Sequence, residues 1–79
     1  MPPTPDQAAL GRAIQSIRNE RGISQMQLVA RTGFVQAWIS QVENGHRNPS
    51  WGNILRVADG LGVSVSELVG RAEELAGSE

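Results

Sequence analysis

The chain has 79 residues, 39% of them hydrophobic, and seven arginines against eight acidic residues give a formal net charge of −1 at pH 7. This length predicts one domain over residues 1–79, with a core from about residue 6 to residue 76 and short flexible termini. The absence of cysteine excludes disulfides and zinc–thiolate sites, and one histidine cannot form a metal cluster, so we expect no metal and no cofactor. No apolar run reaches the roughly 18–20 residues that span a membrane, so we expect a cytoplasmic protein with no membrane partner.

Start and stop signals predict the first two helices. Thr4 is expected to cap the first helix, ahead of a proline at the first helical position. An apolar stripe with helical spacing follows, and Gly22 is suited to end the helix: the stripe consists of Leu10, Ala13, Ile14 and Ile17. Ser24 and Gln27 form a capping box at the start of the second helix, which Gly33 ends after about two turns.

The third helix is expected to begin at Val35 or Gln36 and to run to Asn44, with Gly45 as its stop. Val35 is a poor cap because its side chain accepts no hydrogen bond.

The last two helices have clear caps. Ser50 caps a fourth helix that Gly60 or Gly62 ends, and Ser64 caps a fifth helix that runs to about Ala76. No segment has the alternating pattern of a strand. The predicted fold class is all-α.

The charges are distributed unevenly. The first 58 residues hold six arginines and three acidic residues, whereas the last 21 hold one arginine and five acidic residues. A basic front half suits a partner that carries phosphates, and arginine binds phosphate or guanine with two hydrogen bonds. A GC-rich genome would also produce the arginine bias.

Two short helices joined by a tight turn at Gly33 have the geometry of a helix-turn-helix. The sequence closely resembles the Xre-type family, which includes the DNA-binding domains of phage Cro and lambda repressor. The matching residues are Arg18, Gly22, Ser24, Gln25, Leu28, Thr32, Gly33, Ile39, Ser40, Glu43, Asn44, Gly45, Arg47, Asn48, Pro49, Ser50, Leu61, Gly62, Val63 and Ser64. The resemblance covers about residues 8–72. It implies a compact five-helix lambda-repressor-like fold, with the helix-turn-helix at the second and third helices.

The resemblance implies base-reading residues on the third helix. Gln36 matches a glutamine that reads a base edge, and its amide can pair with adenine N6 and N7. Ala37, Ser40 and Gln41 share that face of the helix. Ala37 is suited to a thymine methyl, Gln41 to another base, and Ser40 to a phosphate or a base.

Other positions are expected to hold the DNA backbone. Gln25 matches the family's phosphate anchor at the start of the second helix, and its amide is also suited to brace Gln36. Asn44, Arg47 and Asn48 lie at and just after the end of the third helix, where a loop can grip the sugar-phosphate backbone.

Arg18 and Glu43 match a family pair that forms an internal salt bridge between the first and third helices. Trp51 stands where the family usually has a leucine, and we expect it in the core. Trp38 departs from the family, which favours a small polar residue there. It can pack beside the second helix, lie along deoxyribose or contact a protein partner.

The fifth helix has more apolar residues than a small core can hide. We expect a homodimer through this helix and the neighbouring end of the fourth, with an interface formed by Val65, Leu68, Val69, Ala72 and Leu75. The alternative is that this stripe only closes the core of the monomer.

The leading hypothesis is a transcriptional regulator, a repressor or autoregulator, that binds double-stranded DNA as a homodimer on an inverted repeat. The alternative is an interaction module of the same fold, such as an antitoxin or a restriction–modification controller, with a toxin or a polymerase subunit as protein partner. We expect no enzyme and no catalytic residues, because the sequence has no carboxylate pair, no nucleophile–base set and no phosphate-binding glycine loop.

Overall fold

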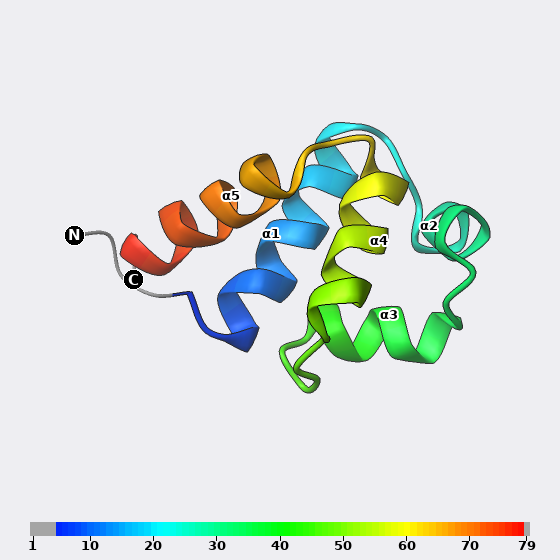
Figure 1. Ribbon diagram of the computed structural model, residues 1–79, viewed down its shortest axis with the longest axis horizontal. Coiled ribbons are helices and arrows are strands. Elements are labelled where there is room, and N and C mark those ends of the chain that lie inside the picture. The colour runs from blue at the N-terminus through cyan, green and yellow to red at the C-terminus, as the bar shows by residue number, and fades with distance from the viewer. Residues whose placement is uncertain (1–4, 79) are drawn as a thin grey trace.

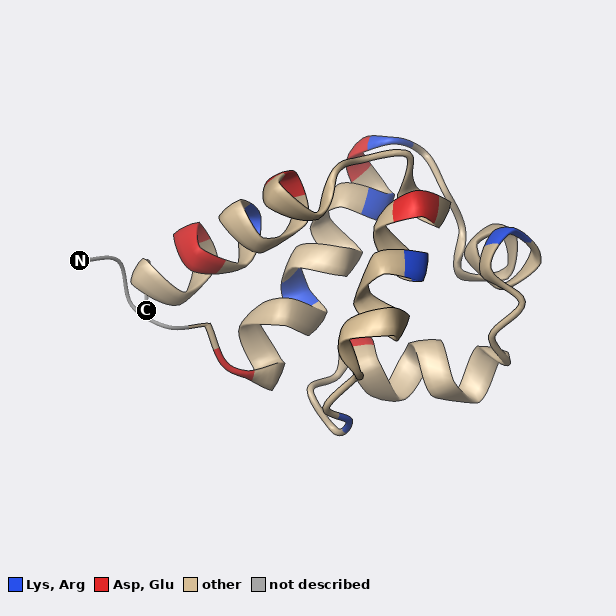
Figure 2. Ribbon diagram, in the orientation of Figure 1, with Lys and Arg blue, Asp and Glu red and all other residues tan. Residues whose placement is uncertain are grey.

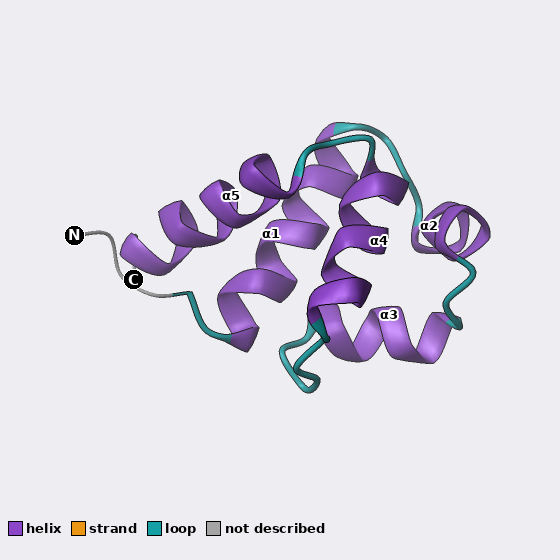
Figure 3. Cartoon of the chain, in the orientation of Figure 1, coloured by secondary structure: helices purple, strands orange, loops and turns teal. Residues whose placement is uncertain are grey.

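Helices make up most of the chain that the structure, a computed structural model, describes, which is residues 5–78 (Figure 1, Figure 3). In chain order they are α1 (Gln7–Glu20), α2 (Gln25–Thr32), α3 (Gln36–Glu43), α4 (Trp51–Leu61) and α5 (Val65–Gly77). No strand is present within residues 5–78, and the expected all-α five-helix fold is confirmed. The expected flexible termini and Thr4 fall on or near residues 1–4 and 79, which lie outside the described range.

Short polar side chains set the starts of four helices. Asp6 caps α1, since its carboxylate accepts a hydrogen bond from the backbone N–H of Ala9 at 2.8 Å. The expected helix start at Thr4 was therefore too early. Ser24 forms the predicted reciprocal capping box on α2, and Ser50 and Ser64 cap α4 and α5 through their hydroxyls.

Gly62, and not Gly60, ends α4. Gly62 has a φ of +75°, a left-handed conformation that an L side chain rarely adopts. Gly60 lies inside the helix, where a Cβ would stand 2.7 Å from the Cγ2 of Thr32. Its missing side chain lets α4 pack closely on α2.

The core joins all five helices, and α1 contacts α3, α4 and α5 (Figure 1). Helix α2 packs against α3 and α4. The largest fully buried side chains come from α2 to α5: Leu28, Ile39, Val42, Leu61 and Leu68. Because Ile39 and Val42 anchor one side of α3 in this core, the other side of α3 faces outward.

Gly11 sets how closely α1 approaches α3. A Cβ on Gly11 would stand 2.3 Å from the backbone oxygen of Val42 and 2.6 Å from that of Glu43. No real contact is this short, so only glycine permits the observed packing. Sequence reasoning missed this residue. An isolated glycine inside an amphipathic helix was the available signal.

Three apolar side chains differ from their expected positions. Trp51 is 61% exposed instead of buried, because it lies in the first turn of α4 and the core positions of that helix belong to Val57, Ala58 and Leu61. Leu68 and Ala72 are 0% and 1% exposed within the single chain. These two residues close the core of the monomer and offer no surface to a dimer interface.

Candidate nucleic-acid interface

The outward face of α3 gathers the side chains expected to read bases. Its buried side is formed by Ile39 and Val42. The helical repeat of 3.6 residues puts positions 36, 37, 40, 41 and 44 on the opposite side. Four of these residues are exposed and Ser40 is half-buried, the exposed ones being Gln36, Ala37, Gln41 and Asn44. The face therefore presents amides, a hydroxyl and a methyl group.

This face carries no exposed charge. Figure 2 shows α3 in tan apart from its end, where Glu43 lies, and that carboxylate is buried. Arginines flank the helix-turn-helix on α2, α4 and the loop after α3: they are Arg31, Arg56 and Arg47 (Figure 2). Acidic side chains recur instead along α5, at Glu67, Glu73 and Glu74. Phosphates would approach the α3 side with less repulsion than the α5 side.

The N-terminus of α3 differs from those of the other helices. Its N-cap residue, Val35, has extended backbone angles and makes no side-chain cap hydrogen bond. Val35 is also 67% exposed, which leaves this end of α3 open to solvent. The first N–H groups of such a helix are available to a phosphate.

A buried ion pair joins α1 to the end of α3. The Arg18 Nε donates to Glu43 Oε2 at 2.8 Å, and Nη2 donates to Glu43 Oε1 at 3.0 Å. The two side chains are 11% and 3% exposed. Arg18 Nη1 also donates to the backbone oxygen of Ile23 at 3.0 Å, which ties in the loop before α2. The pair thereby fixes the orientation of α3 against α1 and α2.

Gln25 extends this cluster to α2. Its amide Nε2 donates to Glu43 Oε1 at 3.1 Å. The side chain thus lies against Glu43 and not against Gln36, which the sequence also suited it to brace. The reason is tertiary: the carboxylate of Glu43 is a stronger acceptor than an amide and lies within reach of the first turn of α2.

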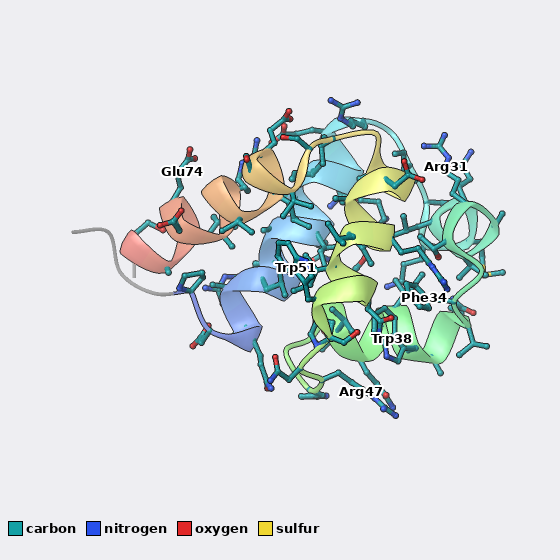
Figure 4. The ribbon with its side chains drawn as sticks, viewed as in Figure 1. Arg31, Phe34, Trp38, Arg47, Trp51 and Glu74 are labelled. Atoms are coloured by element: carbon teal, nitrogen blue, oxygen red, sulfur yellow. The ribbon has the colours of Figure 1, made fainter. Side chains whose placement is uncertain are left out.

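Trp38 packs inside the helix-turn-helix. Its ring centroid lies 4.2 Å from that of Phe34, with the planes tilted by 32°, and the half-buried side chain rests on the core (Figure 4). The Cζ atom of Arg56 lies 5.0 Å from the centroid of the Phe34 ring. Of the roles left open for Trp38, packing beside the turn is the one that its contacts support. The Phe34 ring, stacked on Trp38, also holds Arg56 on the flank of the helix-turn-helix.

Arg47 and Asn48 both lie in the loop after α3 but in different surroundings. Arg47 is exposed on the α3 side of the molecule, and its Nε donates to Gln41 Oε1 at 2.6 Å (Figure 4). Asn48 instead lines a groove together with the first turn of α1. The structure brings Arg47, an expected backbone contact, next to Gln41, an expected base reader. It places Asn48, the other expected backbone contact of this loop, in a groove beside α1.

The groove beside Asn48 has a volume of about 390 Å³ and lies between the start of α1, α4 and α5. Its apolar wall is formed by Leu10, Ile54, Val69 and Ala72. Trp51 precedes Ile54, which lines this groove, by about one helical turn on α4. Leu55, the next apolar residue on α4, is 43% exposed.

A second arginine–glutamate pair lies away from α3. Arg71 on α5 donates to Glu20 on α1, with Nη2 to Oε1 at 3.1 Å, and to the Ser16 hydroxyl at 2.8 Å. The hydrogen bond from Arg71 lowers the pKa of Glu20 from its ordinary value of 4.5, and the same contact raises the pKa of Arg71. This pair fastens α5 to α1.

Within residues 5–78 there is no group of three side chains suited to hold a metal ion. In the same range no helix is both long and apolar enough to cross a membrane.

Curated relatives match most of the chain. An uncharacterized transcriptional regulator of the helix-turn-helix type, y4dJ of Sinorhizobium fredii, is 38% identical over 65 residues, covering 82% of this chain and 84% of that protein. The control protein C.MunI of a Mycoplasma species is 32% identical, covering 81% of this chain and 88% of that protein. The immunity repressor of Bacillus phage phi105 is 34% identical over 77% of this chain but only 42% of that repressor.

Solved structures agree with these relatives. The restriction–modification controller protein C.AhdI of Aeromonas hydrophila superimposes with a TM-score of 0.75 at 32% identity, covering 78% of this chain and 94% of that one. The clp gene regulator ClgR of Corynebacterium glutamicum superimposes with a TM-score of 0.82 at 29% identity, covering 91% and 90%. The family model of the helix-turn-helix domain matches residues 9–69. The chain belongs to the helix-turn-helix domain family.

Proposed function

We propose that the protein is a sequence-specific DNA-binding regulator of transcription that inserts α3 into the major groove of its operator. The observation that carries this proposal is the outward face of α3, which is exposed, uncharged and rich in amides. Such groups match the donors and acceptors of base edges in the major groove. An α-helix of this kind fits that groove, as the recognition helix of a helix-turn-helix does.

The base-reading roles rest on this placement. Gln36, in the first turn of α3, is proposed to pair with an adenine, and Ala37 to contact a thymine methyl. Ser40 is proposed to donate to a phosphate or a base, and Gln41 to read a second base. These residues lie on one face of a helix whose tilt is fixed by Arg18 and Glu43.

The backbone contacts are proposed to surround this face. Gln25 offers its amide and the N-terminus of α2, although a phosphate would compete with Glu43 for that amide. Asn44 and Arg47 lie at the end of α3 and are proposed to contact the backbone there. Asn48 retains this role only if the DNA backbone also passes the groove beside α1.

The relatives support the regulatory half of the proposal, since they include a phage immunity repressor and a control protein. We infer a repressor or autoregulator that acts in the cytoplasm, where its DNA lies, and that catalyses no reaction.

A homodimer on an inverted repeat is proposed, with half-sites roughly 10–11 base pairs apart from centre to centre. The surface proposed for it is the dimer patch, defined as Trp51, Leu55, Ile54, Val65, Val69 and Leu75. Trp51 and Leu55 are exposed and the other four are half-buried. This patch replaces the predicted one, because Leu68 and Ala72 are already buried. A second copy would cover the exposed tryptophan, a residue that commonly anchors interfaces.

The decisive experiment is selection of bound sequences from a random DNA library at near-physiological salt, followed by titration of Gln36→Ala. We expect enrichment of an inverted repeat. The variant should lose about 1–3 kcal/mol on that site and its preference at one base pair. Gln15→Ala, which removes an exposed glutamine from α1, is the matched control and should bind like the parent protein. If no sequence is enriched over scrambled DNA, the proposal fails.

A second candidate function is an interaction module with a protein partner, such as a toxin or a polymerase subunit. The exposed Trp51 and the acidic side of α5 favour it. The same selection separates the two functions. A protein-interaction module has no preference among DNA sequences, so Gln36→Ala would have no such preference to remove.

A further inference from the structure

We propose that Gln41 and Arg47 act as one reading unit that presents hydrogen-bond donors, and that this unit selects guanine over adenine at the base pair facing Gln41. The inference rests on the proposed function and names the base chemistry of part of its site. It assigns a specificity-determining role to an arginine outside the recognition helix.

The contact between the two side chains fixes which way the Gln41 amide points. Arg47 Nε lies 2.6 Å from the Gln41 side chain. An arginine can only donate, so the amide atom facing it must be the oxygen, and the alternative with oxygen and nitrogen exchanged is excluded. The amide nitrogen of Gln41, with its two N–H donors, therefore points away from Arg47.

This orientation changes what Gln41 can read. A glutamine recognises adenine by accepting from N6 and donating to N7 at the same time. On Gln41 the accepting oxygen is occupied by a cation, and an adenine N6 amino group brought to its remaining lone pair would meet the positive charge of Arg47. Guanine presents two acceptors, O6 and N7, and no donor at those positions. The free N–H groups of Gln41 match that pattern.

The loop after α3 delivers Arg47 to this position. Gly45 has a φ of +77° and reverses the chain, the N–H of His46 donates to the backbone oxygen of Gln41 at 2.8 Å, and the N–H of Gly45 donates to Val42 at 3.0 Å. A Cβ on Gly45 would lie 3.0 Å from the Cα of Ala8, so α1 confines the turn. Arg47 is thus set by a closed turn packed on α1.

Gln36 provides an internal contrast. It lies on the same face of α3 and is exposed, but no side-chain hydrogen bond holds its amide within the described part of the chain. Its oxygen and nitrogen are both available, so it retains the pairing that suits adenine. Two glutamines five positions apart on one helix are therefore expected to prefer different purines.

The test uses the operator obtained by selection. Gln41→Ala first identifies the base pair that Gln41 faces, as the position whose preference this variant loses. Duplexes with each of the four base pairs at that position are then titrated with the parent protein. We expect guanine to be preferred over adenine by about 5- to 100-fold.

Arg47→Met, which keeps an unbranched side chain over the aliphatic part of arginine but removes its donors and its charge, is the variant that decides the question. It frees the Gln41 oxygen, so the guanine-to-adenine ratio should fall to near 1 in addition to a general loss of affinity. If Arg47 only holds a phosphate, affinity drops on all four duplexes alike and the ratio is unchanged, which overturns the proposal. Arg21→Met removes an equal charge from the end of α1 and should leave the ratio unchanged.

Gln41→Glu gives a second readout, because it keeps an acceptor for Arg47 and removes both amide donors. Guanine preference should disappear in this variant. Both residues are exposed, so the variants should unfold at the parent temperature, and circular dichroism checks this. A preference for adenine in the parent protein, or a Gln41→Ala variant that changes no base position, overturns the inference while leaving Gln36 and the proposed function intact. Failure to enrich any sequence overturns both.

Discussion

Two arginine–glutamate pairs fasten helices to α1, one joining α3 and the other α5, and they differ in how deeply they are buried. Arg18 and Glu43, 11% and 3% exposed, lie under the recognition helix. Arg71 and Glu20, 27% and 58% exposed, lie at the surface between α5 and α1. A buried charge that loses its partner remains desolvated, whereas an exposed one is hydrated at once. The ion pair between α1 and α3, on the side proposed to contact DNA, is therefore expected to contribute more to stability than the pair between α1 and α5.

The largest effect is expected for Glu43→Ala, which leaves the Arg18 guanidinium buried without its carboxylate. We expect a loss of about 3–5 kcal/mol in the free energy of unfolding, measured by urea denaturation. Glu20→Ala is the matched control in the exposed pair and should cost far less. Equal losses in the two variants would break the comparison.

Next is Gly11→Ala, because the added methyl group would overlap the backbone oxygens of Val42 and Glu43. We expect about 3 kcal/mol of destabilisation, together with weaker operator binding as α3 is displaced. Gly70→Ala on α5 is the control: a Cβ there has nothing within 4 Å. It should stabilise the helix by about 0.5–1 kcal/mol. A Gly11→Ala variant as stable as Gly70→Ala would show that α1 and α3 do not pack so closely.

The proposed dimer patch is probed by Trp51→Ala. If Trp51 anchors the proposed dimer, sedimentation should show dimerisation weakened by about 30-fold or more, with the monomer's thermal unfolding little changed. Met26→Ala, which removes an apolar side chain of similar exposure from α2, should leave the assembly intact. Dimers that resist Trp51→Ala would place the interface elsewhere.

The smallest effect is a pH dependence. Since Arg71 lowers the pKa of Glu20, the folded state favours the ionised carboxylate. The resulting stabilisation is present above the ordinary pKa of 4.5 and is lost as the pH falls below it through the lowered value. Glu20→Gln should unfold slightly earlier than the parent at pH 7, and this difference should be smaller at pH 3 because the carboxylate of the parent protein becomes protonated as the pH falls. In an Arg71→Met background, this difference should be absent at both values.

Local signals predicted much of the fold and of the α3 face. The caps Ser24, Ser50 and Ser64 begin their helices because a hydroxyl satisfies an N–H group only two or three residues away. Helical periodicity likewise predicted which side of α3 faces out, since Ile39 and Val42 mark its buried side.

Apart from the start of α1, where Asp6 and not Thr4 is the cap, the errors concern contacts between distant parts of the chain. Trp51 was expected inside and is exposed, because hydrophobicity does not tell which side of α4 the core occupies. Gln25, which the sequence also suited to brace Gln36, instead donates to Glu43, 18 residues away in sequence. The apolar stripe on α5 left open whether Leu68 and Ala72 belong to a dimer interface or to the monomer's core, and both are buried in the monomer.

By itself, the sequence determined the helices, most of their ends and the polar character of the recognition face, because caps, glycines and apolar spacing act within a few residues. Tertiary structure alone decided how closely α1 meets α3 at Gly11, which residues remain for a dimer, and that Arg47 turns back onto Gln41. These features depend on where the folded chain brings together groups that the sequence keeps apart. A hydrogen bond or a steric contact exists only at that final distance.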